Sequence, residues 1–226
     1  MLAVLVAVGI GWIVFKAVSY NQAQQVYRDI EKAYAGESSG LFNEKSPVDL
    51  AALQSEYPDV VAWIAMDDVN VSYPVVQGTD NDFYLHNDPS GNSNIDGSIF
   101  LDWRNGSLDS DLYALVYGHN MLDESMFGLL DNYTDENFYK AGTGSFMLYT
   151  PNGTYRYKIF SVSVVDPTDD VYQAGFTNSQ AFDAFVRQLK EKSMYDTGVD
   201  VSGSDHVITL STCSDSDRLV LCAKRM

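Results

Sequence analysis

Residues 207–223 read VITLSTCSDSDRLVLCA. Two runs of apolar and β-branched residues flank the Ser/Asp segment 214–217, which is the pattern of a β-hairpin. If these four residues close the turn, Cys213 lies directly opposite Arg218 and the two side chains share one face of the sheet. A guanidinium beside a thiol favours the thiolate and can hold a developing oxyanion. The hairpin therefore predicts a cysteine nucleophile for acyl transfer.

Further strand-like segments precede the hairpin, so most of the chain is expected to be β structure. Apolar, β-branched and aromatic runs occur at 60–65, 69–76, 97–101, 112–117, 145–150 and 155–165, followed by the hairpin strands at 206–212 and 218–223. Gly, Asn, Asp and Pro separate the runs, as is typical of a β-barrel or β-sandwich. Two helices are expected between the strands, a short one at 124–130 and a long one at 179–194. Phe182 and Phe185 recur at helical spacing in the long helix and are expected to pack in the core.

Composition limits both the number of domains and the classes of partner. With 226 residues, 46% of them hydrophobic, the chain can form one compact domain with a sizeable core. The 14 basic and 31 acidic residues give a net charge of −17, so no nucleic acid is expected as a partner. The two cysteines show neither CxxC nor Cys/His-cluster spacing, so neither a disulfide framework nor a zinc site is expected. Any cysteine chemistry would therefore involve a single thiol.

The N-terminal segment has the composition of a membrane anchor. Residues 1–18 read MLAVLVAVGIGWIVFKAV and carry one charge, on Lys16. This length approaches the roughly 20 apolar residues that span a bilayer. No basic region precedes the segment and no small-residue cleavage site follows it, so an uncleaved anchor over 1–19 is favoured over a signal peptide. A buried N-terminal core helix is the alternative, which the abruptly polar sequence after Tyr20 disfavours.

The chain after the anchor divides into a connection, 20–46, and a main domain, 47–226. Within the connection, a helix is expected over 22–35 and a linker with clustered Gly and Ser over 36–46. The first helix of the main domain is expected to begin with Ser46 as its N-cap, because a proline follows at the first helical position.

Three histidines are available as the base or imidazolium partner of Cys213. His206 lies seven residues earlier in one extended run, about 23 Å away at the rise of a strand, and cannot reach the thiol. His86 lies in a loop rich in turn residues and is a weaker candidate. His119 follows the strand-like run 112–117 and so stands at a strand end, as Cys213 does. Strand ends present catalytic groups in rigid scaffolds, although the spacing alone fits a turn residue equally well.

The string Thr209-Leu-Ser-Thr-Cys213, followed by Arg218-Leu-Val-Leu, resembles the signature of sortases, the cysteine transpeptidases of Gram-positive cell surfaces. The class B branch is indicated by VVAWI at 60–64, YPVVQ at 73–77, DNDFYL at 80–85, GSIFLD at 97–102, YGHNM at 117–121 and SMFG at 125–128. The resemblance covers residues 47–223. It implies a mainly β fold: a closed eight-stranded sortase-type barrel with N-terminal helices and one long inserted helix. It also implies a cell-membrane anchor and a catalytic domain outside the cell.

The resemblance assigns roles to particular residues. Cys213 matches the nucleophile, His119 the catalytic histidine and Arg218 the arginine that steadies the substrate and the oxyanion. Positions that contact the substrate or line its pocket are matched by Asn81, Leu85, Thr168, Tyr172, Ser211 and Thr212. The connection between Cys213 and Arg218 is shorter than in many relatives, which leaves Arg225 as a competing arginine and alters the expected rim of the pocket. Asp215 resembles an acidic residue of relatives, and a turn aspartate is its favoured interpretation.

The implied reaction is transpeptidation. The Cys213 thiolate attacks the backbone carbonyl between Thr and the next residue in a C-terminal sorting signal of another surface protein or pilin, and His119 protonates the departing amine. An amine of a peptidoglycan precursor, or a pilin lysine, then accepts the acyl group. No metal or other cofactor is required. Two alternatives remain: an L,D-transpeptidase-like cell-wall enzyme, whose Ser-His-Gly-Cys string is replaced here by Ser211-Thr-Cys213, and an inactive anchored surface or pilus-assembly scaffold.

Overall fold

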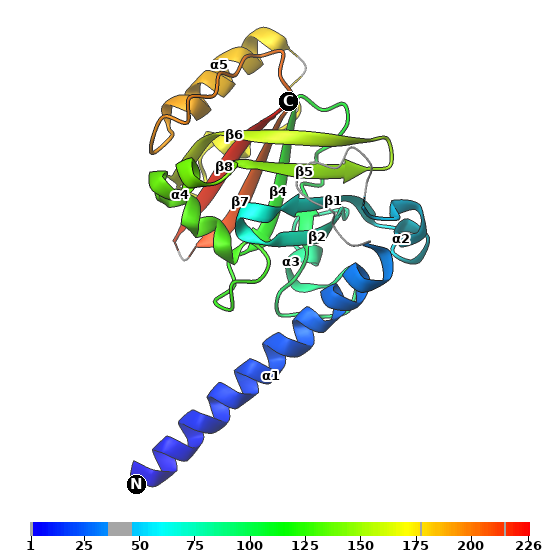
Figure 1. The fold of residues 1–226 in the computed structure, drawn as a ribbon, viewed down its shortest axis with the longest axis vertical. Helices are drawn as coiled ribbons and strands as arrows, with labels where there is room; N and C mark the ends of the chain where they lie inside the picture. Colours follow the sequence, from blue (N-terminus) through cyan, green and yellow to red (C-terminus); the bar gives the residue numbers. More distant parts are fainter. Residues whose placement is uncertain (1, 36–46, 177, 215) are drawn as a thin grey trace.

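Eight strands close into a barrel in the computed structural model of the chain (Figure 1). The structure describes residues 2–35, 47–176, 178–214 and 216–226. The strands are β1 (Val60–Met66), β2 (Val71–Val76), β3 (Ile99–Leu101), β4 (Tyr113–His119), β5 (Ser145–Thr150), β6 (Gly153–Val165), β7 (Val207–Ser214) and β8 (Asp217–Arg225). Each strand overlaps a run that the sequence predicted, and the closed eight-stranded barrel is confirmed.

The order of the strands brings distant parts of the chain together. Around the barrel they follow β1-β2-β3-β4-β7-β8-β6-β5, and β5 pairs back with β1. Two neighbouring pairs are parallel, β2 with β3 and β4 with β7, and the others are antiparallel. Because parallel strands run in the same direction, the C-terminal ends of β4 and β7 lie side by side.

Helices cover the barrel and extend from it: α1 (Leu2–Tyr34), α2 (Leu50–Glu56), α3 (Phe83–His86), α4 (Glu136–Ala141) and α5 (Ser179–Glu191). Three short 3-10 helices join them: η1 (Asp67–Val69), η2 (Gly128–Thr134) and η3 (Asp170–Tyr172). Figure 1 shows α1 projecting from one end of the barrel and α5 at the opposite end. The helices α3 and α4 were not predicted, because segments this short show no helical period in the sequence.

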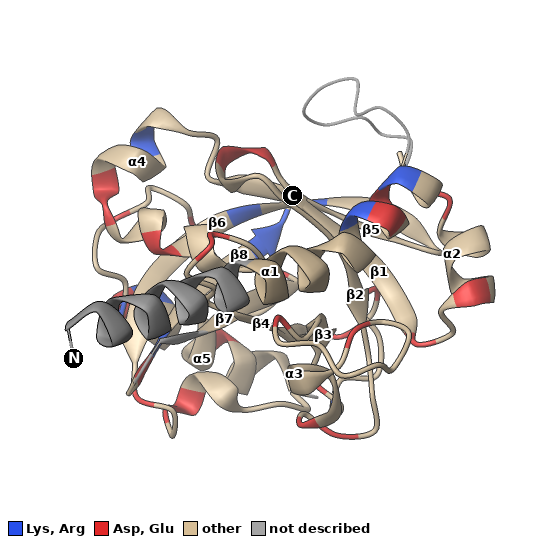
Figure 2. Ribbon diagram, turned by 90° about the horizontal axis from the view of Figure 1, so that it is seen from below, with Lys and Arg blue, Asp and Glu red and all other residues tan. Residues whose placement is uncertain are grey.

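Charged side chains lie mainly outside the barrel. Figure 2 shows acidic residues spread over the loops and helices around it rather than gathered in a single patch. This distribution is that of a solvated surface. Scattered acidic residues of this kind keep the protein soluble and do not form a binding site.

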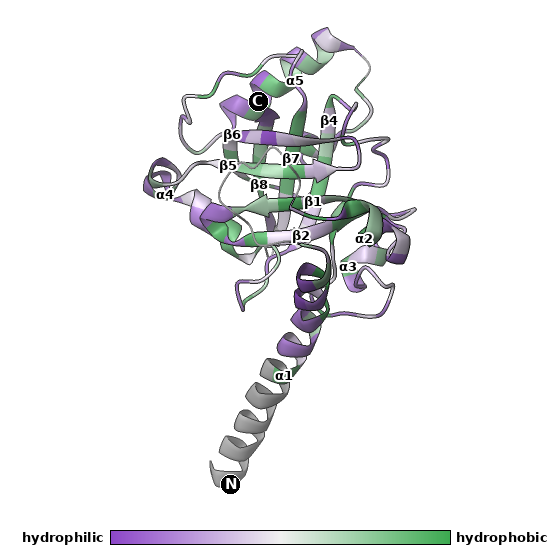
Figure 3. Ribbon diagram, turned by 45° about the vertical axis from the view of Figure 1, so that its right-hand side comes forward, coloured by the Kyte–Doolittle hydropathy of each residue, from purple (hydrophilic) through white to green (hydrophobic). Residues whose placement is uncertain are grey.

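Among the described residues the hydrophobic core has three parts: one inside the barrel, one beneath α5, and one where α1 and α2 pack against the barrel. Ile64, Leu148 and Leu210, from β1, β5 and β7, are fully buried in the interior cluster. Phe182 and Phe185 of α5 are buried against residues of β4, β6, β7 and β8, as the helical spacing predicted. The hydropathy colouring of Figure 3 shows hydrophobic stretches along β1, β4 and β7, whereas β6 also has a hydrophilic stretch. Burial of apolar surface contributes about 25 cal/mol per Å² to stability. Strands that bury apolar side chains on both faces are stabilised from both sides.

The inserted helix ends earlier than predicted. It was expected to continue to residue 194, but α5 ends at Glu191. The chain then turns to bond with β6: the Met194 N–H donates to the Val162 carbonyl at 2.7 Å, and the Val162 N–H donates to Ser193 Oγ at 3.1 Å. The bond from Met194 to the strand replaces the helical bond that its N–H would otherwise make, whereas the Ser193 N–H still donates to the Lys190 carbonyl at 3.2 Å.

The first helix of the main domain begins later than predicted. Ser46 lies outside the described residues, and α2 begins at Leu50 with Asp49 as its N-cap. The Asp49 carboxylate accepts the Ala52 N–H at 3.0 Å, the usual N-cap bond. The Asp49 N–H donates to the Tyr34 carbonyl at 2.9 Å. The segment before α2 is therefore held extended against the end of α1, which prevents an earlier start.

One helix, α1, runs from Leu2 to Tyr34 and so joins the segment predicted as an anchor, 1–19, to the helix predicted over 22–35, ending one residue earlier than predicted. Among the described residues, the helices do not combine the length and the apolar character that crossing a membrane requires. The predicted linker, 36–46, lies outside the described residues. Near its C-terminal end α1 docks on the barrel, where Tyr27 and Ile30 are buried.

The short helix predicted over 124–130 is wrong in its position. Glu124 and Met126 have positive φ angles of 69° and 53°, in the left-handed region that a right-handed helix excludes. The Phe127 N–H donates to the His119 carbonyl at 2.9 Å. The segment is thus folded back onto the end of β4, and the helical turn, η2, follows it.

Candidate active site

The backbone register makes Cys213, His119 and Arg218 neighbours. The parallel β4–β7 pair matches His119 with Cys213, and the antiparallel β7–β8 pair matches Cys213 with Arg218, as the hairpin predicted. Residues paired in this way lie about 5 Å apart between Cα atoms. The hairpin is tighter than expected, since Ser214 pairs with Asp217 one position beyond the cysteine. Three adjacent strands thus bring the three predicted catalytic residues to one end of the barrel, while Asp215 lies outside the described residues.

The His119 ring is oriented by a backbone carbonyl. The side chain is half-buried, and Nε2 lies 2.7 Å from the carbonyl oxygen of Leu85. A carbonyl oxygen can only accept, so Nε2 carries a proton whether the imidazole is neutral or charged. The nitrogen that gains and loses a proton is therefore Nδ1. Leu85 thus fixes a histidine tautomer in addition to lining the pocket described next.

A pocket of about 260 Å³ opens beside these strand ends. It is lined by Asn81, Leu85, Phe100, Tyr117, Gly118, Pro167, Tyr172, Ser211 and Arg218. Four of the six residues predicted to contact substrate are in this set, together with the predicted arginine. The cavity is therefore formed by α3 and the residues before it, the strands β3, β4, β7 and β8, and the segment around η3.

Aromatic side chains build one wall of the pocket. The rings of Tyr117 and Tyr172 stack with centroids 6.2 Å apart and planes inclined by 19°. The Tyr172 hydroxyl and Ser211 Oγ are hydrogen-bonded at 2.9 Å. Burial, followed by the charge of Asp102, raises the pKa of Tyr117 well above its ordinary value. Its hydroxyl therefore stays protonated and donates to Asp102 Oδ2 at 2.9 Å.

The structure distinguishes the two candidate arginines. Arg218 is half-buried in the pocket wall, and its Nη1 donates to the Asp217 carbonyl at 2.9 Å. Arg225 lies at the other end of β8, where its guanidinium is 4.0 Å from the centre of the Tyr155 ring and donates to the Leu108 carbonyl at 2.9 Å. Arg218 is therefore the arginine that lines the pocket, together with Tyr117 and Gly118 of β4, the strand that ends in His119.

Two residues predicted to contact substrate do not line the pocket. Thr168 is exposed, and its hydroxyl donates to the Asp166 carboxylate at 2.6 Å in a local turn; its neighbour Pro167 lines the pocket instead. Thr212 is fully buried, and its Oγ1 has no hydrogen-bond partner among the described residues. Successive strand residues point to opposite faces, so Thr212 faces away from the side on which Ser211 meets the pocket.

Four lining residues were not predicted to contact substrate. Phe100, Tyr117 and Gly118 lie within the GSIFLD and YGHNM strings that carried the resemblance. Their place in those strings was the available signal. Pro167 gave no comparable signal, because a loop proline is common at turns.

The remaining histidines and the second cysteine lie away from the pocket. His86 Nε2 is 3.9 Å from the Asp82 carboxylate at the end of α3, and His206 Nδ1 is 2.9 Å from the Asp111 carbonyl before β7. Cys222 is fully buried, and burial raises the pKa of its thiol to about 12. A thiol with that pKa stays protonated and unreactive. Among the described residues, no three His, Cys, Asp or Glu side chains gather in a way that would hold a metal ion.

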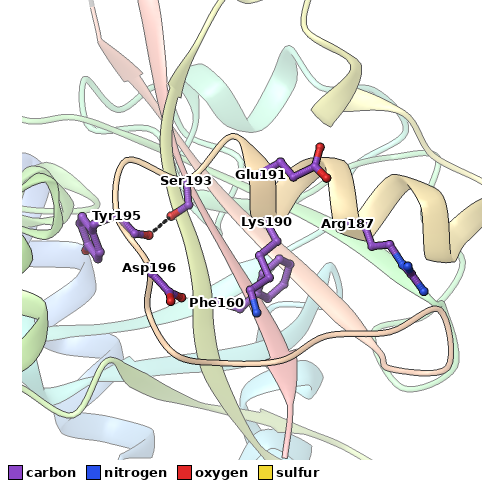
Figure 4. Close-up of a pocket in the computed structure, with 7 residues that line it drawn as sticks. All are labelled: Phe160, Arg187, Lys190, Glu191, Ser193, Tyr195 and Asp196. Atoms are coloured by element: carbon purple, nitrogen blue, oxygen red, sulfur yellow. Dashed lines mark hydrogen bonds between the residues drawn. The ribbon is translucent and has the colours of Figure 1, made fainter.

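A second pocket, of about 470 Å³, lies where α5 meets the following loop and β6 (Figure 4). Its lining consists of Phe160, Arg187, Lys190, Glu191, Ser193, Tyr195 and Asp196. Its two cations are already paired: Arg187 with Asp183 at 2.8 Å and Lys190 with Asp200 at 3.0 Å. None of the predicted catalytic or substrate residues belongs to it, so it is not the candidate active site.

A closed barrel that sets a cysteine, a histidine and an arginine on adjacent strands beside a pocket defines a class of β-barrel cysteine enzymes. The sortase domain family matches residues 64–226. Sortase B of Listeria monocytogenes is 34% identical over 208 residues, covering 90% of this chain and 83% of the relative. Sortase B of Staphylococcus aureus is 32% identical over 180 residues, covering 76% and 72%. The crystal structure of sortase B from B. anthracis in complex with AAEK1 superposes with a TM-score of 0.81 at 32% identity, covering 92% and 98%. The chain belongs to the sortase family and is a sortase B-like cysteine transpeptidase.

Proposed function

We propose that this sortase cleaves the C-terminal sorting signal of a surface protein or pilin after Thr and transfers the acyl group to an amine. The observation that carries the proposal is the register of three adjacent strands, which pairs His119 with Cys213 and Cys213 with Arg218 beside the 260 Å³ pocket. The acceptor is an amine of a peptidoglycan precursor or a pilin lysine. The reaction needs no metal or other cofactor.

In the first half-reaction, the Cys213 thiolate adds to the carbonyl carbon between Thr and the next residue. The Arg218 guanidinium stabilises the negative charge that develops on the carbonyl oxygen, an effect of about 3–4 kcal/mol for one well-placed donor. The C–N bond then breaks, and protonated His119 gives its Nδ1 proton to the departing amine. The products are a thioester on Cys213 and a free amine.

In the second half-reaction, the acceptor amine attacks the thioester carbonyl. Neutral His119 takes a proton from the attacking nitrogen at Nδ1, while its Nε2–H remains hydrogen-bonded to the Leu85 carbonyl. The C–S bond breaks and Cys213 leaves as the thiolate, which restores the starting state. The new amide joins the surface protein to the acceptor.

The pocket supplies the binding groups for the peptide. We assign substrate binding to Asn81, Leu85, Tyr172 and Ser211, which line it. Thr212 contributes to the oxyanion environment through its place next to Cys213. Thr168, being exposed and outside the lining, would contact only parts of the peptide that extend beyond the pocket.

The location that fits this chemistry is the outer surface of the cell membrane. We propose that residues 1–19 are a single anchor and that residues 47–226 form the catalytic domain outside the cell. The apolar composition of the first 18 residues supports the anchor. The clients, surface proteins and wall precursors or pilins, are all available on that side.

Replacement of Cys213 tests the proposed reaction. The full chain, mixed with a sorting-signal peptide and an amine, is expected to form transpeptidation product detectable by mass spectrometry, together with a thioester on the protein. Cys213→Ala is expected to abolish both, because a thiolate is the nucleophile. Cys222→Ala provides the matched control, since this buried thiol lies outside the pocket, and it should retain activity. Product formation by Cys213→Ala, or an inert wild type, would contradict the proposal, the latter in favour of an inactive scaffold.

A further inference from the structure

A buried carboxylate lies directly behind the pocket. Asp102 follows β3 and is fully buried, yet it is not among the pocket-lining residues. Burial alone would raise the pKa of this group, but hydrogen bonds from Arg104, Asn81 and Tyr117 outweigh it and hold the pKa at about 2. A carboxylate of this kind is ionised throughout the range in which the enzyme works, and its charge must be compensated inside the protein.

Arg104 compensates the charge of Asp102 through a bidentate salt bridge. Its Nε donates to Asp102 Oδ1 at 2.8 Å and its Nη2 donates to Oδ2 at 2.7 Å. The Arg104 backbone N–H adds a third bond to Oδ1 at 2.9 Å. Bidentate guanidinium–carboxylate pairs of this geometry are rigid in direction as well as strong. The pair is therefore a fixed point behind the cavity.

The same pair holds three residues of the pocket wall. Asn81 Nδ2 and the Tyr117 hydroxyl each donate to Asp102 Oδ2 at 2.9 Å. On the other side of the pair, Arg104 Nη2 donates to the Tyr172 carbonyl at 3.0 Å. These three residues come from the loop before α3, from β4 and from η3, segments that are far apart in the sequence.

The contacts fix hydrogen-bonding direction in the wall as well as position. Because a carboxylate only accepts, the Asn81 amide must turn its nitrogen to Asp102, and its oxygen accepts the Trp103 N–H at 3.0 Å. The Tyr117 hydroxyl donates its only proton in the hydrogen bond to Asp102. What remains for a bound peptide is the second N–H of Asn81 and the lone pairs of Tyr117. Asn81 and Tyr117 therefore present a donor and an acceptor, respectively, in a set arrangement.

We propose that Asp102 and Arg104 are positioning residues, which hold Asn81, Tyr117 and Tyr172 in the orientation that recognises the acyl-donor peptide. The inference rests on the acyl-transfer function proposed above. Neither residue meets the reacting atoms; both act through the wall. Their removal should therefore weaken peptide binding more than it slows the chemistry at Cys213, because the contacts that are lost hold groups of the binding wall and not the reacting atoms.

The test separates KM from kcat in the full chain. The probe is the fluorescence-quenched, Thr-containing peptide that the wild type cleaves fastest from a synthetic library. Asp102→Asn keeps the size of the side chain but loses the charge, and it is expected to raise KM about tenfold or more with a smaller change in kcat. Arg104→Gln should act in the same direction. Arg104→Lys, which keeps the charge without the bidentate salt bridge, should fall between Arg104→Gln and wild type.

A matched control and a double-mutant cycle exclude a purely structural role. Asp68 is a half-buried carboxylate that accepts from Thr143 N–H, Gly144 N–H and the Tyr133 hydroxyl, none of which lines the pocket. Asp68→Asn should lower the melting temperature and leave KM unchanged. If Asp102 acts through Asn81, the effects of Asp102→Asn and Asn81→Ala on KM should combine to less than their product.

The outcomes are distinguishable. Folded Asp102→Asn and Arg104→Gln variants with a KM within about twofold of wild type would overturn the inference, as would fully multiplicative effects with Asn81→Ala. If Asp102→Asn does not fold, Arg104→Lys decides, since it keeps a positive charge beside Asp102 and the Arg104 side chain is 37% exposed. A wild type that turns over no peptide of the library contradicts the proposed function itself and, with it, this inference.

Discussion

At the scale of single residues, Gly118 shows how tightly the packing constrains the catalytic strand. A Cβ atom at this position would lie 2.5 Å from Ile99 Cδ1 and 2.7 Å from Phe127 Cδ2, and both neighbours are fully buried. Gly118 directly precedes His119 and pairs with Thr212 across β4 and β7. Any relief of the contact must therefore shift either the barrel core or the strand that carries the histidine.

Gly118→Ala is expected to destabilise the fold by about 1–3 kcal/mol, the usual cost of overpacking a filled core, and to lower kcat/KM through displacement of His119. Urea unfolding and the peptide assay measure the two effects. Gly106→Ala is the control, because a Cβ there meets only Asp111 Oδ1 at an ordinary 3.5 Å. A Gly118→Ala protein as stable and as active as the control would show that the core yields more easily than the contacts indicate.

At the scale of elements, α1 docks on the barrel through a buried polar contact. Gln24 Nε2 donates to Asp96 Oδ2 at 2.7 Å, and Gln24 Oε1 accepts the Tyr73 hydroxyl at 3.2 Å. Asp96 is fully buried, and its Oδ1 has no hydrogen-bond partner among the described residues. Burial, with a smaller contribution from the charge of Asp123, raises the pKa of Asp96 from 3.8 to about 6 despite the bond from Gln24. The docked helix therefore favours the protonated acid.

This raised pKa makes stability depend on pH in a defined direction. Between about pH 4 and pH 6 the folded chain binds the proton of Asp96 more tightly than the unfolded chain does, so stability falls as the pH rises through that window. The loss is about 3 kcal/mol at most when the window is complete. Asp96→Asn, which cannot ionise, should remove this slope and be more stable than wild type above pH 6. Urea unfolding at a series of pH values measures the change of the unfolding free energy with pH. The same pH dependence in Asp96→Asn and wild type would contradict the raised pKa of Asp96.

Which elements the sequence predicts follows from the range of the interactions that form them. The eight strands were predictable because alternating and apolar runs are local signals, and so was α5 with its Phe182 and Phe185. The displaced helix at 124–130 was not, because the left-handed Glu124 and Met126 are set by bonds to the end of β4. The order of the barrel was also inaccessible to periodicity, since the parallel β4–β7 pair joins strands far apart in the chain and was implied only by the resemblance.

The candidate site divides along the same line. The hairpin turn alone predicted that Cys213 faces Arg218, because a short turn fixes register locally. The proximity of Cys213 to His119 could not be predicted from local sequence, because it depends on the parallel pairing of β4 with β7 in the barrel. Asp102 was not singled out, because its importance lies in bonds to Asn81 and, through Arg104, to the carbonyl of Tyr172, and nothing in its own neighbourhood of the sequence signals them.

At the scale of the whole molecule, the long helix α1 projects away from the barrel that carries the candidate active site (Figure 1). The described residues that line the pocket all lie at or beyond Asn81 in the sequence. We therefore expect the proposed anchor, 1–19, to be separable from catalysis, since terminal segments can often be removed without loss of the fold. Docking of α1 through Gln24 and Tyr27, which lie beyond the anchor, is kept in such a deletion.

We expect the full chain to fractionate with membranes and a chain lacking residues 1–19 to be released, with kcat/KM within about twofold of the full chain in detergent. On intact cells, a membrane-impermeant amine reagent should label the full chain, because side chains such as Lys140, 62% exposed, lie on the catalytic domain. The inactive Cys213→Ala chain should behave identically in both assays, which separates location from activity. Labelling that appears only after lysis would place the catalytic domain on the inner side and contradict the proposed orientation, whereas a soluble full chain would contradict the anchor.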